Sequence, residues 1–336
     1  MYSSKDLKKI LKKIFLKHGL KKNDALISAE LIVYAEIVGA STHGVSRLKM
    51  YCDRIKKKLI NPRPNIRIKH ISQSISHIDA DNCIGFVSAN LGIKQAISNA
   101  KKSGIGMVGV KKSGHYGLSS YYIEQAVKKD YIAICFTNAP PAIAPYGSKK
   151  SLFGTNPIAF GVPVKSRIPF IFDSSMSKIN RGKIRIAEKL GKSLPYGVAL
   201  DKYGKLTTNP KDALSGVQLP IGDHRGSGLA WMVDILCGVF TGSSHGGKVK
   251  DPFEDFSGPQ NIGHLFIVFK KNLFDKGFDK QIKLNIQRVK KLPRKDPRKK
   301  IRYPGEKKYY NFKNNLKKKI KLPKKVYNEL QILINT

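Results

Sequence analysis

Apolar residues in the first part of the chain recur at helical spacing. Between Asp6 and Lys17 they fall every three or four positions, which predicts an amphipathic helix. A second helix is predicted over residues 24–38, with Asn23 as its candidate N-cap. A third is predicted over 45–59, because Asn61-Pro62 is a stop signal directly after it. The N-terminal part of the chain is therefore expected to be helical.

From residue 65 onward, alternating apolar positions and short apolar runs become common. Residues 65–80 alternate and predict strands. Further apolar runs predict strands at 107–110, 132–137 and 264–269, and helical spacing predicts helices at 84–102, 118–129, 226–241 and 324–334. Glycine- and proline-rich loops separate strands over much of the region up to 270, and no internal repeat is visible. The pattern predicts an α/β chain with a helical N-terminal part and a mixed β central part.

Composition supports a folded protein inside a reducing compartment. The chain has 336 residues, of which 41% are hydrophobic, so a sizeable core is expected and global disorder is excluded. Its four cysteines lack CxxC spacing, which argues against a disulfide framework or a zinc ribbon. No apolar run reaches the roughly 18 residues of a membrane-spanning helix, and no secretory signal is recognisable. We therefore expect a cytoplasmic protein without a membrane association.

The charge of the chain is strongly positive and admits two interpretations. The sequence has 63 Lys and Arg residues against 23 Asp and Glu, a net charge of +40. Such a balance is found in proteins that bind nucleic acid or anionic membranes. Lysine pairs and triples, however, recur along the whole chain rather than in one stripe, which favours a compositional bias. The densest stretch, residues 290–325, is where a polyanion site would be sought.

A Gly-x-Gly-x-x-Gly string at residues 104–109 does not predict a dinucleotide site. The dinucleotide fingerprint follows a strand and opens a helix, so that the pyrophosphate meets the amides of a helix N-terminus. Here a predicted helix precedes the glycines and a predicted strand follows them. The string is therefore expected to be a tight helix-to-strand turn.

Three side chains with useful chemistry lie four residues apart: His43, Arg47 and Tyr51. If a helix begins near Gly44, the three side chains lie on one face of that helix or at its N-terminal end. A histidine can transfer a proton near neutral pH, an arginine can hold a carboxylate with two parallel hydrogen bonds, and a tyrosine adds a directional donor. On spacing alone, a solvated face with one capping histidine is an equally good interpretation. Ser41 or Thr42 is a candidate N-cap.

Other short strings are weaker signals taken singly. His115 lies between glycines at a predicted strand-to-helix junction, where it either approaches a ligand or closes a turn. Small residues and a cation at 222–228 open the helix predicted at 226–241, which suits a phosphate group. The histidines show no metal-ligand spacing, so no metal is expected. Neither a Gly-x-Ser-x-Gly elbow nor a cysteine nucleophile is recognisable.

Eight strings together resemble one family, the type 2 malate/L-lactate dehydrogenases. They occur in the family's order and span nearly the whole chain: Thr-His-Gly-Val-x-Arg-Leu at 42–48, Gly-His-Tyr-Gly at 114–117, Pro-Tyr-Gly at 145–147, Gly-Thr-Asn-Pro at 154–157, Phe-Asp at 172–173, Arg-Gly-Lys at 181–183, Arg-Gly-Ser-Gly-Leu at 225–229 and Tyr-Pro-Gly-Glu at 303–306. The family also includes ureidoglycolate dehydrogenase, 2,3-diketo-L-gulonate reductase and sulfolactate dehydrogenase.

The resemblance implies an NAD(P)-dependent oxidoreductase acting on the CH–OH group of donors (EC 1.1.1). The hydride would pass between nicotinamide and C2 of a small 2-hydroxy or 2-oxo acid such as malate, lactate or ureidoglycolate. The implied fold is the sulfolactate-dehydrogenase-like one, not a Rossmann fold: a mixed, mostly antiparallel cofactor domain with a helical N-terminal domain. By analogy a helical domain spans 12–64, an NAD(P)-binding domain spans 108–291, and a third domain combines 1–11, 65–107 and 292–336. A homodimer is also implied.

The resemblance also assigns residues. His43 matches the catalytic histidine, and His115 matches a second histidine proposed for proton transfer that also lies near the cofactor. Arg47 is implied in catalysis and in substrate binding, together with Thr42, which replaces the usual serine, and Tyr51. The remaining cofactor contacts that it implies are Ser177, Lys178, Ile179, Arg225, Pro304, Gly305 and Glu306. NAD and NADP both stay open, and the alternative function is a catalytically degenerate basic descendant that binds RNA or another polyanion.

Overall fold

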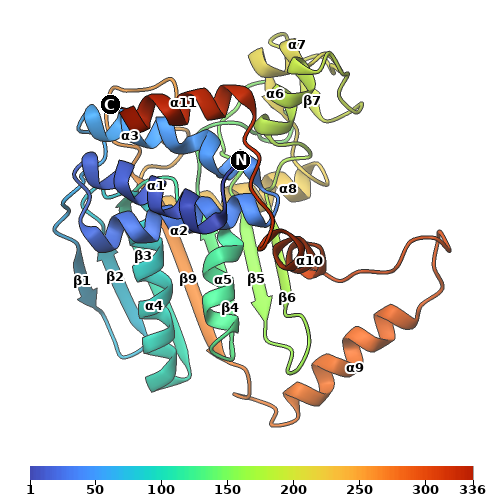
Figure 1. The fold of residues 1–336 in the computed structure, drawn as a ribbon. Helices are drawn as coiled ribbons and strands as arrows, with labels where there is room; N and C mark the ends of the chain where they lie inside the picture. The colour runs from blue at the N-terminus through green and yellow to red at the C-terminus, as the bar shows by residue number, and fades with distance from the viewer. Residues whose placement is uncertain (336) are drawn as a thin grey trace.

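A seven-stranded sheet forms the centre of the molecule (Figure 1). The computed structural model describes residues 1–335. The strands lie in the order β1 (Arg67–His70), β2 (Ile75–Asp79), β3 (Ile105–Ser113), β9 (Ile262–Lys270), β4 (Tyr131–Thr137), β5 (Ile158–Val162) and β6 (Phe170–Ser174). Neighbouring strands are antiparallel except β2 and β3, which are parallel. The predicted α/β class with a mixed, mostly antiparallel sheet is confirmed.

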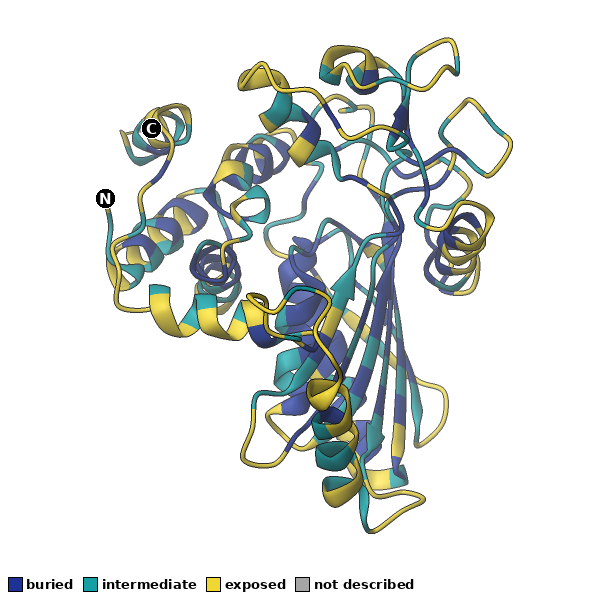
Figure 2. Ribbon diagram, turned by 90° about the vertical axis from the view of Figure 1, so that its right-hand side faces the viewer, coloured by how far each residue is buried: buried dark blue, intermediate teal, exposed yellow. Residues whose placement is uncertain are grey.

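Helices cover both faces of this sheet. On one face lie α4 (Gly85–Ser103), against β3 and β9, and α5 (Ser119–Val127), against β4 and β5 (Figure 1). On the other face α8 (His224–Asp234) runs into a π-helical turn, Ile235–Val239, that packs against β9. The buried residues accordingly concentrate in the strands and the inner sides of the helices (Figure 2).

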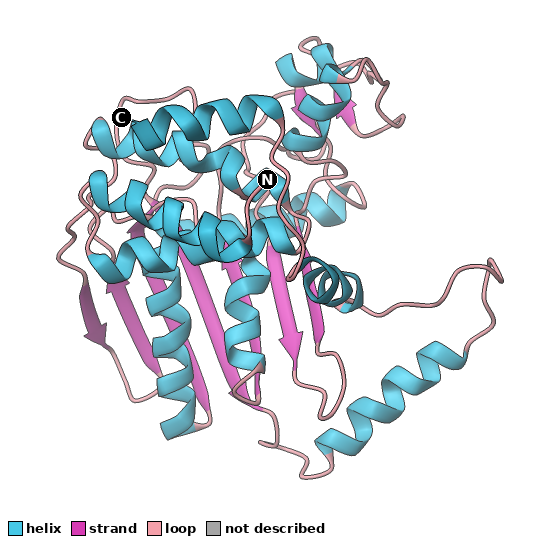
Figure 3. Ribbon diagram, in the orientation of Figure 1, coloured by secondary structure: helices cyan, strands magenta, loops and turns pink. Residues whose placement is uncertain are grey.

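A helical layer lies across one end of the sheet (Figure 3). It contains α1 (Ser4–Lys17), α2 (Lys22–Ile37), α3 (Leu48–Lys56) and α11 (Lys324–Asn335). The two ends of the chain meet here, because Tyr2 and Ile320 exchange two backbone hydrogen bonds of 3.0 and 2.7 Å. The first and last segments of the sequence thus belong to one layer.

The third predicted helix needs a correction. Residues 45–47 form a 3-10 turn, and α3 runs only from Leu48 to Lys56. It ends early because Lys58 adopts a left-handed conformation with φ of 59°. The N-cap at Asn23 is also wrong, since α2 begins at Lys22 after Lys21. By contrast, α4 ends at Ser103 and β3 begins at Ile105, so the glycine string is the predicted helix-to-strand turn.

Four helices were not predicted from the sequence. The short α6 (Arg181–Lys189) and α7 (Pro210–Ser215) form a small lobe with the two-stranded sheet of β7 (Ala199–Leu200) and β8 (Val217–Gln218) (Figure 1). The other two, α9 (Phe278–Lys291) and α10 (Glu306–Asn315), lie beyond β6. A helical signal was present in α9, whose apolar positions recur at every third or fourth residue.

The predicted division into three domains stays a prediction. Its boundary between residues 107 and 108 falls within β3, and one sheet includes strands from both sides of it. Within residues 1–335, no helix has the length and apolar character needed to cross a bilayer.

Candidate active site

The segment that carries His43 is held between α2 and α3 by a half-buried carboxylate. Residues 41–43 and 45–47 form two 3-10 turns around Gly44. Glu36, near the end of α2, accepts a hydrogen bond of 2.8 Å from the backbone N–H of Val45. A Cβ atom at Gly44 would lie 2.0 Å from Glu36 Oε1, so only glycine permits this approach. Neither Ser41 nor Thr42 is an N-cap, since the turn starts from Ala40.

His43, His115 and Tyr51 converge although they come from distant parts of the chain. The imidazole rings of His43 and His115 stack with their centroids 5.6 Å apart. Tyr51 Oη, from α3, lies 2.6 Å from His115 Nδ1, and Thr42 Oγ1 lies 3.0 Å from His43 Nδ1. Each ring therefore has one nitrogen held by a hydroxyl group, and no other side chain or backbone group of residues 1–335 forms a hydrogen bond with its second nitrogen.

Burial makes both histidines neutral near physiological pH. It lowers the pKa of His43 to about 3, and the neighbouring Arg47 guanidinium adds to this effect. The pKa of His115 is lowered well below its usual range for the same two reasons, burial first and Arg47 second. A neutral imidazole can accept a proton at a nitrogen whose lone pair is free, although a lowered pKa makes it a weaker base.

Arg47 has a donor group free for an anion. Its Nε donates to the backbone carbonyl of Thr42 at 2.9 Å, and its guanidinium lies over the ring of Phe253, 5.1 Å from the centroid. These two contacts fix the plane of the guanidinium. Among residues 1–335, its two NH2 groups have no hydrogen-bond partner, so they can form the two parallel bonds that a carboxylate accepts.

A partly buried ion pair lies beside His43. Asp173, in β6, accepts hydrogen bonds from Lys308 Nζ at 2.7 Å and from the backbone N–H of Ser120 at 3.1 Å. Burial alone would raise the pKa of Asp173, but the Lys308 ammonium and the bonds from Ser120 lower it overall. The Asp173 carboxylate favours the protonated form of His43, whereas Lys308 opposes it. This carboxylate is thus placed to stabilise an imidazolium at position 43.

A second buried network holds the segment before His115. The ring of His264 is fully buried, with Nδ1 2.8 Å from Thr137 Oγ1 and Nε2 2.7 Å from Ser113 Oγ. Ser113 follows an irregularity in the pairing of β3 with β9, where Lys112 has a φ of 51°. Gln260 Oε1 accepts the backbone N–H of His115 at 3.3 Å. These bonds position the turn that presents His115.

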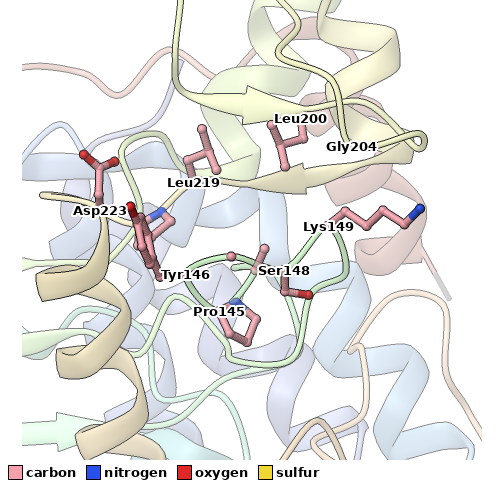
Figure 4. Close-up of a pocket in the computed structure, with 11 residues that line it drawn as sticks. Pro145, Tyr146, Ser148, Lys149, Leu200, Gly204, Leu219 and Asp223 are labelled. Atoms are coloured by element: carbon pink, nitrogen blue, oxygen red, sulfur yellow. The ribbon is translucent and has the colours of Figure 1, made fainter.

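The predicted cofactor residues after β6 lie together beside a cleft. Lys178 donates its backbone N–H to Leu219 O at 2.8 Å, and its ammonium pairs with Asp223 at 2.8 Å. Ser177 and Ile179 are buried in the same segment. The cleft has a volume of about 290 Å³ and lies between the 144–149 loop and the segment containing Leu219, Pro220 and Asp223 (Figure 4).

The N-terminus of α8 beside this cleft suits a phosphate group. Arg225 is exposed in the first turn of the helix. Asp223, the N-cap residue, makes no side-chain bond to the first-turn amides, because its carboxylate pairs with Lys178. Uncapped amides and a nearby cation bind phosphate oxygens. Arg225 and these amides beside the cleft therefore suit a phosphate group of the nicotinamide dinucleotide that the resemblance implies.

Pro304, Gly305 and Glu306 lie elsewhere along β6. Pro304 O accepts the backbone N–H of Ile171 at 3.1 Å, so this turn borders the first half of the strand. The Glu306 side chain is buried, pairs with Lys290 and accepts the N–H of Tyr303. The Glu306 carboxylate is therefore occupied by Lys290 and Tyr303 of the same chain. Pro304 and the backbone of the turn are what remains exposed for a ligand.

The structure thus groups the predicted residues into two neighbourhoods. One contains Thr42, His43, Arg47, Tyr51 and His115. The other follows β6 and contains Ser177, Lys178, Ile179 and Arg225, with the 304–306 turn nearer the start of that strand. The sequence did not predict the ion pair that Asp173 and Lys308 form beside His43. For Asp173 a signal was present, because it is an acidic residue at the end of an apolar strand. Within residues 1–335, no group of three acidic, histidine or cysteine side chains is arranged to hold a metal ion.

Comparison with known proteins identifies the family of the chain. A family model described as malate/L-lactate dehydrogenase matches residues 2–331. The chain is 35% identical over 331 residues to malate/(S)-sulfolactate dehydrogenase of Methanothermus fervidus, covering 98% of this chain and 96% of the relative. It is 32% identical to the (2R)-3-sulfolactate dehydrogenase (NADP(+)) of Chromohalobacter salexigens, over 93% of this chain and 92% of the relative.

The solved structures show the same fold. Sulfolactate dehydrogenase from Methanocaldococcus jannaschii superposes with a TM-score of 0.93 at 32% identity, covering 99% of this chain and 96% of the other. The match extends over both neighbourhoods and over the helical layer. The protein therefore belongs to the malate/L-lactate dehydrogenase family.

Proposed function

We propose that this chain is an NAD(P)-dependent oxidoreductase that interconverts a small 2-hydroxy acid and its 2-oxo acid, with His43, Arg47 and His115 at its catalytic centre. Family membership supports the reaction class. The observation that carries the assignment of residues is the stacking of His43 on His115 at 5.6 Å, beside an arginine with free donor groups. The roles of individual residues are our proposal.

Arg47 would bind the substrate carboxylate. A planar guanidinium holds a carboxylate with two bonds, and contact with Phe253 keeps its plane constant. Fixing the carboxylate also fixes the adjacent C2 atom, and such positioning lowers the barrier of the reaction. Thr42 and Tyr51, which hold the two histidine rings, complete the substrate side of the site.

His43 would transfer the proton of the C2 hydroxyl. In the oxidative direction its neutral imidazole accepts that proton, and in the reductive direction the imidazolium returns it to the developing alkoxide. The lowered pKa of His43 suits the acceptor state, and the nearby Asp173 carboxylate offsets the charge once the proton has arrived. His115 would hydrogen-bond the substrate oxygen through Nε2–H, because Nδ1 accepts the hydroxyl hydrogen of Tyr51.

NAD(P) supplies the hydride acceptor or donor when it is bound. The residues that would hold it are Ser177, Lys178, Ile179 and Arg225 beside the cleft, with the backbone of the 304–306 turn and His115 toward the catalytic centre. Lys178 forms an ion pair with Asp223, and Arg181 donates to Leu214 O. Both cations thus have partners within the protein, and neither indicates a site for the 2′-phosphate of NADP. NAD and NADP therefore both stay candidates.

We further propose a cytoplasmic homodimer with the three-domain division predicted above. Support for the dimer comes from a row of exposed apolar side chains along α8 and the following π-helical turn, which includes Trp231, Ile235 and Phe240. Exposed apolar rows of this kind are typical of interfaces. Light scattering after size-exclusion chromatography measures the mass, and a monomer at all concentrations would contradict the dimer.

Nicotinamide fluorescence tests the function directly. The protein is titrated with NADH and NADPH separately, and then with a panel of 2-oxo acids. We expect saturable binding of one nucleotide and its oxidation by at least one acid. A folded protein that binds neither nucleotide at low salt would contradict the proposal. The polyanion-binding alternative would then be tested on the lysine-rich stretch 290–325; no feature of residues 1–335 favours it at present.

A further inference from the structure

Arg54 is a fully buried arginine whose contacts converge on one loop. It lies in α3 and exposes none of its surface to solvent. Its Nη1 donates a hydrogen bond of 2.9 Å to the carbonyl of Asp255, and its Nη2 donates one of 2.9 Å to the carbonyl of Gly258. Its Cζ also lies 5.8 Å from the centroid of the Phe256 ring. All three partners belong to the segment between β9 and the small lobe that we call the 250–260 loop.

A buried guanidinium holds this loop at an energetic cost. The Nε of Arg54 is buried and has no hydrogen-bond partner within residues 1–335. Two carbonyl groups only partly compensate a charge for its lost hydration. What the arginine provides is direction, because its planar guanidinium fixes two separate carbonyls of the loop relative to α3. The loop is therefore attached to the helix at two points rather than one.

The first part of the loop places a ring beside Arg47. The carbonyl of Asp251 accepts the backbone N–H of Asp255 at 3.1 Å, and its Oδ1 accepts that of Phe253 at 2.8 Å. This segment is one hydrogen-bonded turn, and Arg54 holds its last carbonyl. The Phe253 ring lies 5.1 Å from Arg47 Cζ. Burial lowers the pKa of Arg47, and the charge of Asp251 acts in the opposite direction, so the turn also supplies a compensating charge.

The last part of the loop reaches the second histidine. Gln260 is buried, and its Oε1 accepts the backbone N–H of His115 at 3.3 Å. Its Nε2 donates to the carbonyl of the first residue of the loop at 3.2 Å, so this side chain also closes the base of the loop. Only Pro259 separates Gln260 from Gly258, whose carbonyl binds Arg54, and the fixed φ of proline limits movement between them.

Helix α3 thus holds His115 from two directions. Tyr51 Oη lies 2.6 Å from His115 Nδ1, and Tyr51 precedes Arg54 by three residues in the same helix. Residues three apart lie on one side of a helix. The ring of His115 is therefore connected to α3 directly through Tyr51, and its backbone N–H is connected to the same side of α3 through the loop and Arg54.

We propose that Arg54 is a positioning residue for the reaction and acts through the 250–260 loop. Through Phe253, it holds the guanidinium of Arg47. Through Gln260, it holds the backbone of His115. The distance between the group that binds the substrate carboxylate and the second histidine then depends on a residue remote from both. The inference rests on the proposed function for the roles of Arg47 and His115, whereas the attachment of the loop depends only on the contacts of Arg54.

Steady-state kinetics tests this role, with the 2-oxo acid of the panel that the protein reduces fastest as substrate. In Arg54→Met we expect kcat/KM to fall by roughly 10- to 100-fold, with a lower kcat and a higher KM, because Arg47 and His115 both lose their support. Arg54→Lys keeps the charge but cannot hold two carbonyls, so it should restore only part of the loss. Lys56→Met, at an exposed position of α3, is the matched control and should keep the wild-type kcat/KM.

A double-mutant cycle separates positioning through the loop from a merely structural effect. Phe253→Leu removes the ring beside Arg47 and should raise KM by roughly fivefold on its own. Because Arg54→Met already releases this ring, adding Phe253→Leu to it should change KM by less than about twofold. Gln260→Leu should show the same dependence on Arg54 in kcat. Effects that multiply independently, or an Arg54→Met enzyme with the wild-type kcat/KM, would overturn the inference.

Hydrogen exchange tests the attachment of the loop without any turnover. In Arg54→Met, the amides of residues 250–260 and of His115 should exchange at least about tenfold faster than in the wild type, while those of α4 stay unchanged. Lys56→Met should exchange like the wild type, and Arg54→Lys replaces Arg54→Met if the latter does not fold. Faster exchange of the loop in a protein whose wild type reduces no 2-oxo acid would contradict the proposed function alone. Unchanged exchange of the loop would overturn the inference.

Discussion

The phenolic oxygen of Tyr51 lies 2.6 Å from Nδ1 of His115. Burial raises the pKa of Tyr51 well above its usual range, so the phenol keeps its proton and can donate it to the imidazole. That bond selects the tautomer in which Nε2 carries the hydrogen. A side chain on α3 thereby determines which ring nitrogen of His115 carries the hydrogen.

Tyr51→Phe should weaken catalysis without unfolding the site. The ring keeps its contact with Phe86, at 4.9 Å between centroids, but His115 loses its hydrogen-bond partner. We expect kcat to fall by about tenfold, the equivalent of one hydrogen bond of about 1.4 kcal/mol. Steady-state kinetics measures this, with Tyr121→Phe as the control. An unchanged kcat would remove Tyr51 from the positioning of His115.

His43→Ala should affect the chemical step and spare nucleotide binding. Loss of a general acid–base residue lowers kcat by about 10²–10⁴. The dissociation constant for the reduced nucleotide, measured by its fluorescence, is expected to stay within a factor of two of the wild-type value. His70→Ala, on the exposed β1, is the matched control. If turnover is unaffected, another group transfers the proton.

Arg47→Lys should mainly raise KM. Lysine keeps the positive charge but cannot form two parallel bonds to a carboxylate, and it loses the stacking on Phe253. We expect KM to rise by roughly 10-fold or more, with a smaller change in kcat. Steady-state kinetics measures the effect, and Arg67→Lys, on the exposed β1, is the control variant. A KM that does not change would place the carboxylate anchor at a different residue.

Lys308→Met should destabilise the protein, because it leaves Asp173 without its cation. The carboxylate side chain is only 12% exposed, and an unpaired buried charge is costly. Since Lys308 itself is 33% exposed, water already screens the pair, and we expect a loss of about 1–3 kcal/mol in the free energy of unfolding. Urea denaturation measures it. Lys307→Met, at the exposed neighbouring position, should have no effect; equal stabilities of the two variants would contradict the prediction.

Stability should fall as the pH drops from 7 to 5. The pKa values of His43 and His264 are lowered to about 3 in the folded protein by burial, below the usual value of 6.5. The unfolded chain therefore binds protons that the folded chain does not, and acid favours unfolding below about pH 6.5. Each such histidine contributes a slope of up to about 1.4 kcal/mol per pH unit. Urea midpoints at pH 5, 6 and 7 test this; His264→Gln should reduce the slope, and a constant midpoint would contradict it.

Local patterns were sufficient for much of the fold. Helical spacing of apolar residues predicted α1, α2, α4, α5 and α11, because these helices bury apolar sides against the core. Short apolar runs predicted the central strands, because helices cover both faces of the sheet there. The order of helix, glycine string and strand at 103–105 was enough to exclude a dinucleotide fingerprint there. The helices that were missed lie in lysine-rich or proline-flanked segments, where charge obscured the apolar positions of α9.

The sequence by itself predicted from a spacing of four residues that His43, Arg47 and Tyr51 lie close together, although the structure distributes them over two 3-10 turns and α3 rather than one helix face. It also determined the family, because eight strings occur in the family's order. Only the tertiary structure decided that His115, Asp173, Lys308 and Arg185 surround them. Those contacts join segments distant along the chain, and they depend on how α3, α5, α6, α10 and β6 pack. In a sequence with 63 Lys and Arg residues, the pattern alone does not distinguish a cation that lines a site from one that faces water.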